Sequence, residues 1–301
     1  MSRKLRAYID LLRLQFFFAW PLLFCSGYLL AISVYGGFSW PALLQAALIG
    51  FFGFEAGLVL NDYVDRDYDK FDIEQDKLTK YWRAFGSRPV SEGLIPPRAA
   101  LALFLILAII TMGLILTFPY PNSLFVLGIM LVCYALEVFY QLKKRKECIP
   151  VAQLAGRIDF ALFPVAGYLC AGSPDSTALL YFAFFYPFAL AHLGANDLID
   201  VNNDRARGMN TITTLYHERG TAFWIAGFTV ANILMAILFM TQLGWIARAG
   251  IVLGLVLLSI ANVVIVKYQT PDACLKVLPL FHVTMLIYAG SIVLNSAVSL
   301  F

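Results

Sequence analysis

Residues 99–118 read AALALFLILAIITMGLILTF, twenty residues without a charged side chain. A transmembrane helix needs about 20 mainly apolar residues, because only a structure that satisfies its own backbone hydrogen bonds can cross a hydrocarbon core about 30 Å thick. This stretch is therefore predicted to span a membrane as a helix.

Similar apolar runs recur along the whole chain of 301 residues, 60% of which are hydrophobic and 15% aromatic. The mean hydropathy of +0.76 lies far above that of soluble proteins. We predict an all-α, polytopic membrane protein with nine transmembrane helices bundled around a central cavity. The predicted spans are 14–35, 41–60, 99–118, 122–142, 150–171, 177–197, 222–241, 246–266 and 277–298. They form one domain over residues 1–301, in which spans 1–4 and 5–8 are a pseudo-repeat and span 9 is an addition.

The fifth run differs from the others because Arg157 and Asp159 interrupt it. Two ionisable groups within a span usually face a cavity or each other. An alternative interpretation is a shorter span that starts at the membrane interface.

The 22 basic residues support this topology. All except Arg157 and Arg248 fall in the N-terminal segment, in alternate loops or at the adjoining span ends. Lys and Arg collect in cytoplasmic loops, so we expect a cytoplasmic N-terminus, an external C-terminus and an integral position in the cell or inner membrane.

Three further features narrow the class of protein. Residues 1–13 form a basic, amphipathic lead-in to a span too long for a signal-peptide core, and we expect them to lie along the membrane surface. The five cysteines lack metal-type spacing, and no basic-aromatic block indicates nucleic-acid binding.

Two copies of one acidic motif end the second and sixth spans. Residues 61–69 read NDYVDRDYD and residues 196–204 read NDLIDVNND, with identical residues at the leading Asn, which is Asn61 and Asn196, and at three Asp positions. Four spans separate the copies, so the two helices run the same way and both motifs emerge on one membrane face. We expect them to face each other across one cavity.

The spacing of the aspartates indicates a metal site. Within each copy they fall at i, i+3 and i+7, which places them on one helical face. Six carboxylates that converge repel one another unless cations neutralise them. Mg2+ prefers oxygen ligands and is typically held by one or two carboxylates plus substrate phosphate oxygens. We therefore expect Mg2+, as two ions, to hold a diphosphate between the motifs.

A metal-bound diphosphate is a good leaving group, because the ions and nearby Lys or Arg stabilise the charge that develops as its C–O bond breaks. Basic residues on the same membrane face are candidates for this contact: Arg66, Arg83, Arg88, Lys143, Arg205 and Arg207. Asp67, Asp72 and Asp76 lack counterparts in the second copy and are expected to face solvent. His192 precedes Asn196 by one helical turn and is expected to be a packed core histidine, with a place on the cavity wall as the alternative.

At these motifs the chain resembles the UbiA-type intramembrane prenyltransferase superfamily, which has nine transmembrane helices and two aspartate-rich motifs after helices 2 and 6. The likeness covers nearly the whole chain. It includes RPVSEG at 88–93, similar to the family's Arg-Pro-x-x-x-Gly turn, and YQLK at 140–143, similar to its Tyr-x-x-Lys element. Two departures are a longer stretch between Asp69 and Arg88 and the sequence ITT at 212–214, where a Thr-Leu-Pro-like sequence often occurs.

The resemblance assigns roles to individual residues. It implies that Asn61, Asp62, Asp65 and Asp69, with Asp197, Asp200 and Asp204, hold Mg2+ and diphosphate, and that Asn196 supports the second cluster. Arg88, Tyr140 and Lys143 would contact the diphosphate or the carbocation. Arg66 and Arg205 remain candidate diphosphate ligands, and Asp65, Asp69, Asp200, Asp204, Tyr140 and Lys143 are the expected catalytic residues.

The expected reaction is Mg2+-dependent transfer of a polyprenyl group, from a prenyl diphosphate such as geranylgeranyl diphosphate, to a lipid-soluble acceptor within the membrane lipid. The acceptor would be a quinone precursor, another aromatic ring or a prenylglyceryl phosphate. A divalent-cation transporter with two acidic repeats is the alternative, although transporter repeats often run in opposite directions and bind at the bilayer midplane. A non-catalytic isoprenoid-binding scaffold is a third interpretation.

Overall fold

The chain is helical throughout the part that the computed structural model describes, residues 1–300, and no strand occurs there. The α-helices are α1 (Arg3–Leu11), α2 (Ala19–Tyr35), α3 (Trp40–Asp65), α4 (Leu78–Trp82), α5 (Pro97–Leu116), α6 (Asn122–Lys143), α7 (Val151–Gly156), α8 (Ile158–Leu169), α9 (Ser176–Ile199), α10 (Val201–Arg207), α11 (Ile212–Phe239), α12 (Trp245–Tyr268) and α13 (Pro271–Leu300). Three 3-10 turns join them: η1 (Leu14–Phe16), η2 (Asp69–Phe71) and η3 (Met240–Gln242).

Eight helices in residues 1–300 are long and apolar enough to cross a membrane. They correspond to every predicted span except the fifth. Residues 150–171 instead form α7, with 6 residues, and α8, with 12 residues, which meet at Arg157. The prediction of nine continuous spans is therefore not confirmed. The charged pair Arg157 and Asp159 lies at the break and lines an internal cavity. These two charges, which interrupt the apolar run in the sequence, are the physical reason for the break.

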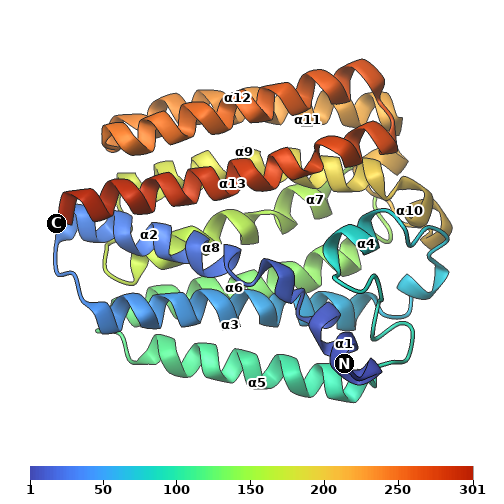
Figure 1. The fold of residues 1–301 in the computed structure, drawn as a ribbon, viewed down its shortest axis with the longest axis horizontal. Helices are drawn as coiled ribbons and strands as arrows, with labels where there is room; N and C mark the ends of the chain where they lie inside the picture. Colours follow the sequence, from blue (N-terminus) through green and yellow to red (C-terminus); the bar gives the residue numbers. More distant parts are fainter. Residues whose placement is uncertain (301) are drawn as a thin grey trace.

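The long helices run side by side along one direction, and the short helices α1, α4 and α10 gather at one end of the bundle (Figure 1). The described end of α13 lies at the opposite end (Figure 1). Helix α3 packs on α5, α9 on α11, and α12 on α13, while α2 packs on α8 from the second half of the chain. The polar connections therefore meet at one end, and the apolar helices form the walls behind them.

Two glycines allow α2 and α8 to cross at backbone contact. A Cβ atom on Gly27 would lie 1.9 Å from the Pro164 carbonyl oxygen, and one on Gly167 would lie 2.0 Å from the Phe24 carbonyl oxygen. Small residues at helix crossings are typical of membrane bundles, where close packing replaces the hydrophobic effect between helices. This crossing holds α8 beside α2.

The amphipathic N-terminal segment forms α1 and is attached to the loop that follows α4. The carboxylate of Asp10, which is fully buried, accepts hydrogen bonds from the Phe85 N–H at 2.8 Å and the Ser87 N–H at 2.9 Å. Helix α1 thereby fixes the loop that leads to Arg88.

Candidate functional site

Both acidic motifs lie at the end of the bundle where α1, α4 and α10 gather. Helix α3 ends at Asp65 and η2 begins at Asp69, while α9 ends at Ile199 and α10 follows directly. Each motif therefore crosses the end of a helix, and its last carboxylate lies on the element that follows, not on the single helical face that the spacing predicts. All six are buried, with exposed fractions of at most 8%: Asp62, Asp65, Asp69, Asp197, Asp200 and Asp204.

Cations neutralise each carboxylate of the first motif. The Arg83 guanidinium donates to both oxygens of Asp62, at 2.8 and 2.9 Å, and Arg13 donates to the same carboxylate at 2.9 Å. The Lys144 ammonium lies 2.8 Å from the Asp65 carboxylate. Such paired charges offset part of the free energy that burial costs each ion.

The second motif is held mainly by hydrogen bonds. Asp197 accepts from the Ile212 N–H at 3.0 Å, and Asp204 accepts from the Thr211 hydroxyl at 2.9 Å. Both donors belong to the start of α11, where Thr211 also caps the helix. The turn that leads into α11 thus orients two of the three carboxylates.

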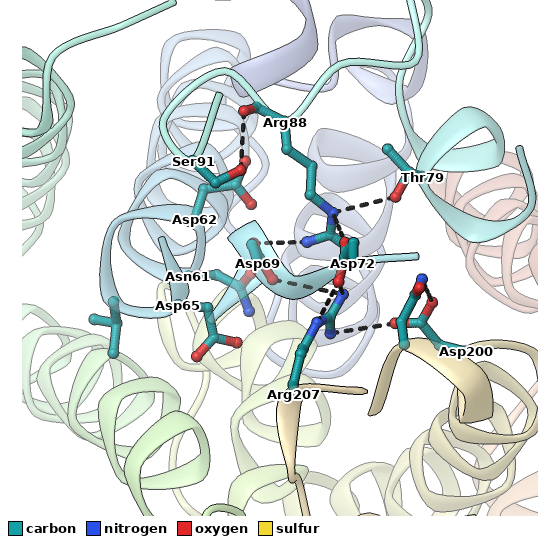
Figure 2. Close-up of polar contacts among 12 residues, drawn as sticks. Asn61, Asp62, Asp65, Asp69, Asp72, Thr79, Arg88, Ser91, Asp200 and Arg207 are labelled. Atoms are coloured by element: carbon teal, nitrogen blue, oxygen red, sulfur yellow. Dashed lines mark hydrogen bonds and ion pairs between the residues drawn. The ribbon is translucent and has the colours of Figure 1, made fainter. Parts of the chain in front are cut away.

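Arg207 joins the two motifs. Its guanidinium lies 3.6 Å from Asp69 of the first motif, and 3.3 and 3.5 Å from Asp200 and Asp204 of the second. Figure 2 shows Arg207 and Arg88 entering the same cluster from opposite sides, with Asp69 and Asp72 between them. Arg88 lies 2.6 Å from Asp69. The two motifs therefore meet through a shared guanidinium, as we expect from their parallel placement.

Asn203 ties the loop after the first motif to the second motif. Its side-chain oxygen accepts from the N–H groups of Ile73 and Glu74, at 2.9 and 2.8 Å. Its side-chain nitrogen donates to Asp200 at 2.7 Å and to the Glu74 carbonyl at 2.8 Å. This amide is 1% exposed and satisfied on both sides, so it fixes how the two copies face each other.

A cavity of about 260 Å³ begins at this cluster and extends between the helices. Its polar end is lined by arginines and the lysine together with the second-motif carboxylates: Arg13, Arg83, Arg88, Lys144, Arg157, Arg207, Asp197, Asp200 and Asp204. Its other walls are apolar, formed by Trp20, Phe54, Met130, Phe160, Phe163, Phe188 and Met285. One site therefore combines a charged head with a hydrophobic body, as an amphiphilic ligand requires.

Tyr140 lies on the cavity wall between two cations. The Lys144 ammonium is 4.8 Å from the centre of its ring, and the Arg157 guanidinium carbon is 5.0 Å from it. Arg157 and Asp159 also line the cavity, which confirms that the charges within the fifth run face a cavity. The Arg157 Nε is buried without a hydrogen-bond partner in residues 1–300, so a ligand oxygen would satisfy it.

The structure brings most of the sequence-predicted residues together and leaves three outside. Asn61, Asn196, Arg88 and Tyr140 line the cavity, as the second-motif aspartates do, whereas the first-motif aspartates lie directly behind the basic residues. The other three point away: Lys143 is exposed, Arg66 contacts the Tyr63 carbonyl and Asp67, and Arg205 pairs with Glu218 at 3.0 Å.

One expectation about the acidic residues is wrong, and several cavity residues have no role predicted from the sequence. Asp72 is expected to face solvent, but its side chain is 1% exposed because it pairs with Arg88 at 2.7 Å and with Arg207. Asp67 is 59% exposed, as expected. Sequence reasoning gives no site role to Arg13, Lys144 or Glu137 and no diphosphate contact to Arg157, which it expects only to face a cavity or Asp159. The amide of Asn61 donates to Glu137 at 2.7 Å. A charged residue inside an apolar run is the signal that could have identified Glu137.

Burial and mutual repulsion raise the pKa of two carboxyl groups outside the membrane-spanning helices. The pKa of Asp204 is raised to about 7 by burial and by the neighbouring Asp200. Burial also raises the pKa of Asp72, against the opposing effect of Arg88. Such shifts mark a place where a further cation would be stabilising.

The donor set fits a hard divalent cation, although the carboxylates do not already surround one point. No three His, Cys, Asp or Glu side chains among residues 1–300 lie close enough together to hold a metal ion alone. Mg2+ does not require such a cage, because one or two carboxylates, waters and substrate phosphates complete its octahedron. The buried, oxygen-only set of two facing motifs meets that requirement.

Comparison with known proteins gives the family. The sequence profile of the UbiA prenyltransferase family matches residues 18–286. Over 200 residues the chain is 28% identical to a 4-hydroxybenzoate octaprenyltransferase from Alkalilimnicola ehrlichii, across 66% of this chain and 59% of that protein. It is also 28% identical over 217 residues to a digeranylgeranylglyceryl phosphate synthase from Natronomonas pharaonis, across 71% of this chain and 72% of the relative.

Solved structures share the fold. A UbiA homologue from Aeropyrum pernix K1 superposes with a TM-score of 0.74 at 18% identity, and covers 93% of this chain and 98% of its own. A UbiA homologue from Archaeoglobus fulgidus bound to DMAPP and Mg2+ gives a TM-score of 0.62 at 13% identity, over 95% and 98% of the two chains. At these identities the likeness establishes the helical architecture alone.

Proposed function

The chain belongs to the UbiA prenyltransferase family, and from this premise we propose that it transfers a polyprenyl group from an allylic diphosphate to a lipophilic, hydroxyl-bearing acceptor. The diphosphate of the donor, such as geranylgeranyl diphosphate, binds between the two aspartate motifs with two Mg2+ ions. The acceptor is a 4-hydroxybenzoate-like aromatic ring or a prenylglyceryl phosphate. The site faces the cytoplasm, together with the N-terminus.

The observation that carries this proposal is the meeting of both motifs at the charged end of one cavity. Arg207 contacts carboxylates of both copies, and Arg88, Lys144 and Arg157 line the same head. A diphosphate needs such a set of cations, because guanidinium groups hold phosphate oxygens through paired hydrogen bonds. The apolar walls then accommodate the isoprenoid chain.

The residues divide the chemistry between them. Asn61, Asp62, Asp65, Asp69, Asp197, Asp200 and Asp204 are the proposed Mg2+ set, and bound Mg2+ would stabilise the negative charge on the departing diphosphate. Arg88, Arg157, Arg207 and Lys144 hold the diphosphate oxygens and fix the leaving direction. Asn196 supports the second cluster.

The walls of the cavity exclude water and stabilise the allylic carbocation. The ring of Tyr140 faces the charged head, and Phe188, Phe160 and Trp20 line the deeper part. Aromatic faces attract a positive charge, by about 2 kcal/mol or more where water is excluded. As the C–O bond ionises, these rings stabilise the allylic cation until the acceptor attacks.

The direct test incubates purified protein in lipid nanodiscs with Mg2+, geranylgeranyl diphosphate and either 4-hydroxybenzoate or geranylgeranylglyceryl phosphate. We expect one of the two acceptors to gain one geranylgeranyl group in the mass spectrum, with stoichiometric release of diphosphate. EDTA should abolish both signals. Turnover of neither acceptor, or turnover that persists in EDTA, would refute the proposal.

A further inference from the structure

Two histidines that the proposed diphosphate site does not use line the same cavity. His192 lies on α9 and His282 lies on α13, and their Nε2 atoms are 2.9 Å apart. The Nδ1 atom of His282 lies 2.6 Å from the hydroxyl of Tyr81 on α4. Tyr81, His282 and His192 therefore form one hydrogen-bonded chain that joins three separate elements.

The chain can accept and pass on a proton. A contact between two imidazole Nε2 atoms requires one N–H donor and one lone pair, so only one proton lies between the two rings. The hydroxyl of Tyr81 either donates to Nδ1 of His282 or accepts from it. Both arrangements are neutral, and exchange between them moves a proton along the chain.

The position of His192 along α9 places the pair beside the reacting end of the donor. Phe188, His192, Asn196 and Asp200 all line the cavity and recur at intervals of four residues. Each interval advances about 6 Å along the helix. His192 therefore lies one turn from Asn196 toward the apolar wall, the direction in which the prenyl carbon extends from a diphosphate held at Asp200.

Aromatic packing fixes the orientation of His282. The ring of Trp82 meets it edge to face, with centroids 4.8 Å apart, and the ring of Tyr81 stacks on it at 5.4 Å. Tyr81 and Trp82 belong to α4, within the stretch between Asp69 and Arg88 that is longer than the family resemblance leads us to expect. Both side chains that pack on the imidazole therefore come from this stretch.

The pair supplies neutral proton acceptors in a cavity whose other acceptors are carboxylates, namely Glu137, Asp159, Asp197, Asp200 and Asp204. Asn196 faces His192 from one turn along α9, with its amide nitrogen 3.4 Å from Nε2. The charge of Arg157 acts on His192 from the α7–α8 break. Its guanidinium cannot accept a proton, and the neighbouring ring of Tyr140 is held between two cations.

We propose that the His192–His282 pair removes the hydroxyl proton of the acceptor, with Tyr81 as the positioning residue. This inference rests on the proposed function. The C–O bond of the prenyl diphosphate breaks and its electron pair leaves with the diphosphate. An electron pair of the acceptor forms the new bond to the allylic carbon, and the acceptor proton passes to the imidazole pair. A phenol and a glyceryl alcohol both supply such a hydroxyl.

The test compares His192→Asn and His282→Asn with the matched control His217→Asn, which changes an exposed histidine at the bend of α11. With the acceptor that the wild type uses, each cavity variant should lower kcat by about 100-fold or more, the contribution usual for a general base. The KM for the acceptor should stay within about threefold of wild type, because binding groups are retained. Tyr81→Phe should lower kcat by a smaller factor.

Two further measurements separate a proton-transfer role from a structural one. Mg2+-dependent binding of geranylgeranyl S-thiolodiphosphate, a donor analogue that resists ionisation, should stay near the wild-type Kd in every variant. The double variant should be no slower than either single variant, because two residues that act as one unit give non-additive losses.

The possible results discriminate between this inference and its premise. Cavity variants whose kcat stays within about threefold of the His217→Asn control would overturn the role of the pair while the proposed function stands. The same conclusion follows if analogue binding and kcat fall together. A wild-type protein that prenylates neither acceptor overturns the premise and the inference with it.

Discussion

Asp200 is the residue at which the two motifs are most directly connected. It accepts from Asn203 at 2.7 Å and lies 3.3 Å from Arg207, which also contacts the first motif. We expect Asp200→Asn to lower prenyl transfer by about 100-fold or more, because a proposed ligand of the Mg2+ that stabilises the leaving group is lost. The rate of product formation in nanodiscs, followed by mass spectrometry, measures this effect.

Asp76→Asn is the matched control, because Asp76 lies in the loop that follows the first motif but is exposed. It should retain the wild-type rate and thermal stability. Equal rates for the two variants would remove Asp200 from the catalytic set.

We expect magnesium binding to depend on pH through Asp204. Its pKa of about 7 lies above the ordinary value near 3.9, so the carboxyl is protonated below pH 7 in the folded protein. A metal ligand must be deprotonated, so apparent Mg2+ affinity should fall by about tenfold for each pH unit below 7 and level off above about 8. Titration calorimetry between about pH 5.5 and 8.5 tests this, and Asp204→Asn should flatten the profile.

The neighbouring lysines at the end of α6 form a matched pair for a second substitution experiment. Lys144 lies 2.8 Å from Asp65 and lines the cavity, whereas Lys143 is exposed. Lys144→Met should lower the rate of prenyl transfer by at least about tenfold. The substitution removes an ammonium group that is proposed to bind the diphosphate, and it takes one of the positive charges away from the buried Asp65 carboxylate. Lys143→Met should keep the wild-type rate, and the reverse order of effects would contradict this assignment.

At the scale of the element, the crossing of α2 and α8 is the contact least tolerant of added volume. Gly167→Ala brings a methyl group to 2.0 Å from the Phe24 carbonyl oxygen, so the helices must separate. Overpacking of this kind costs about 1–3 kcal/mol, and the unfolding temperature in detergent should fall by several degrees. Gly128→Ala is the control, since its added Cβ meets no atom within 4 Å; it should be neutral or mildly stabilising.

Helix periodicity predicts the long elements well and their ends poorly. Every uninterrupted apolar run is a helix in the structure, because about 20 apolar residues have no other stable form in a bilayer. The break at Arg157 and the placement of α4 depend on side chains from other helices. Successive residues of a helix point in directions about 100 degrees apart. To predict that Lys144 and not Lys143 faces the cavity, the end of α6 would have to be known to within a single residue.

The candidate site is predictable where the sequence repeats itself. Two copies separated by an even number of spans must end at one face, which the structure bears out. The partners of those carboxylates are not predictable in the same way. Arg13 lies 49 residues from Asp62 and Lys144 lies 79 residues from Asp65 in the chain. Asp72, without a counterpart in the second copy, is buried only because Arg88 and Arg207 converge on it.

At the scale of the whole molecule, the bundle joins a charged end and an apolar interior in one cavity. The helices that carry the motifs run in parallel, and the loops between them hold one another through Asn203. Burial of so many charges is costly unless counter-charges are supplied. The protein's own arginines and lysine supply part of these counter-charges, and the proposed magnesium diphosphate would add both cations and anions.

The central claim is that both motifs hold a single magnesium diphosphate, and a double-mutant cycle on ligand binding tests it directly. The measurement is the Kd of geranylgeranyl S-thiolodiphosphate with Mg2+ for the wild type, Asp65→Asn, Asp200→Asn and the double variant. A shared site predicts a loss of at least about tenfold in each single variant and a double variant no weaker than the poorer single one, since the losses couple strongly. Losses that multiply, or a single variant with unchanged affinity, would contradict a shared site.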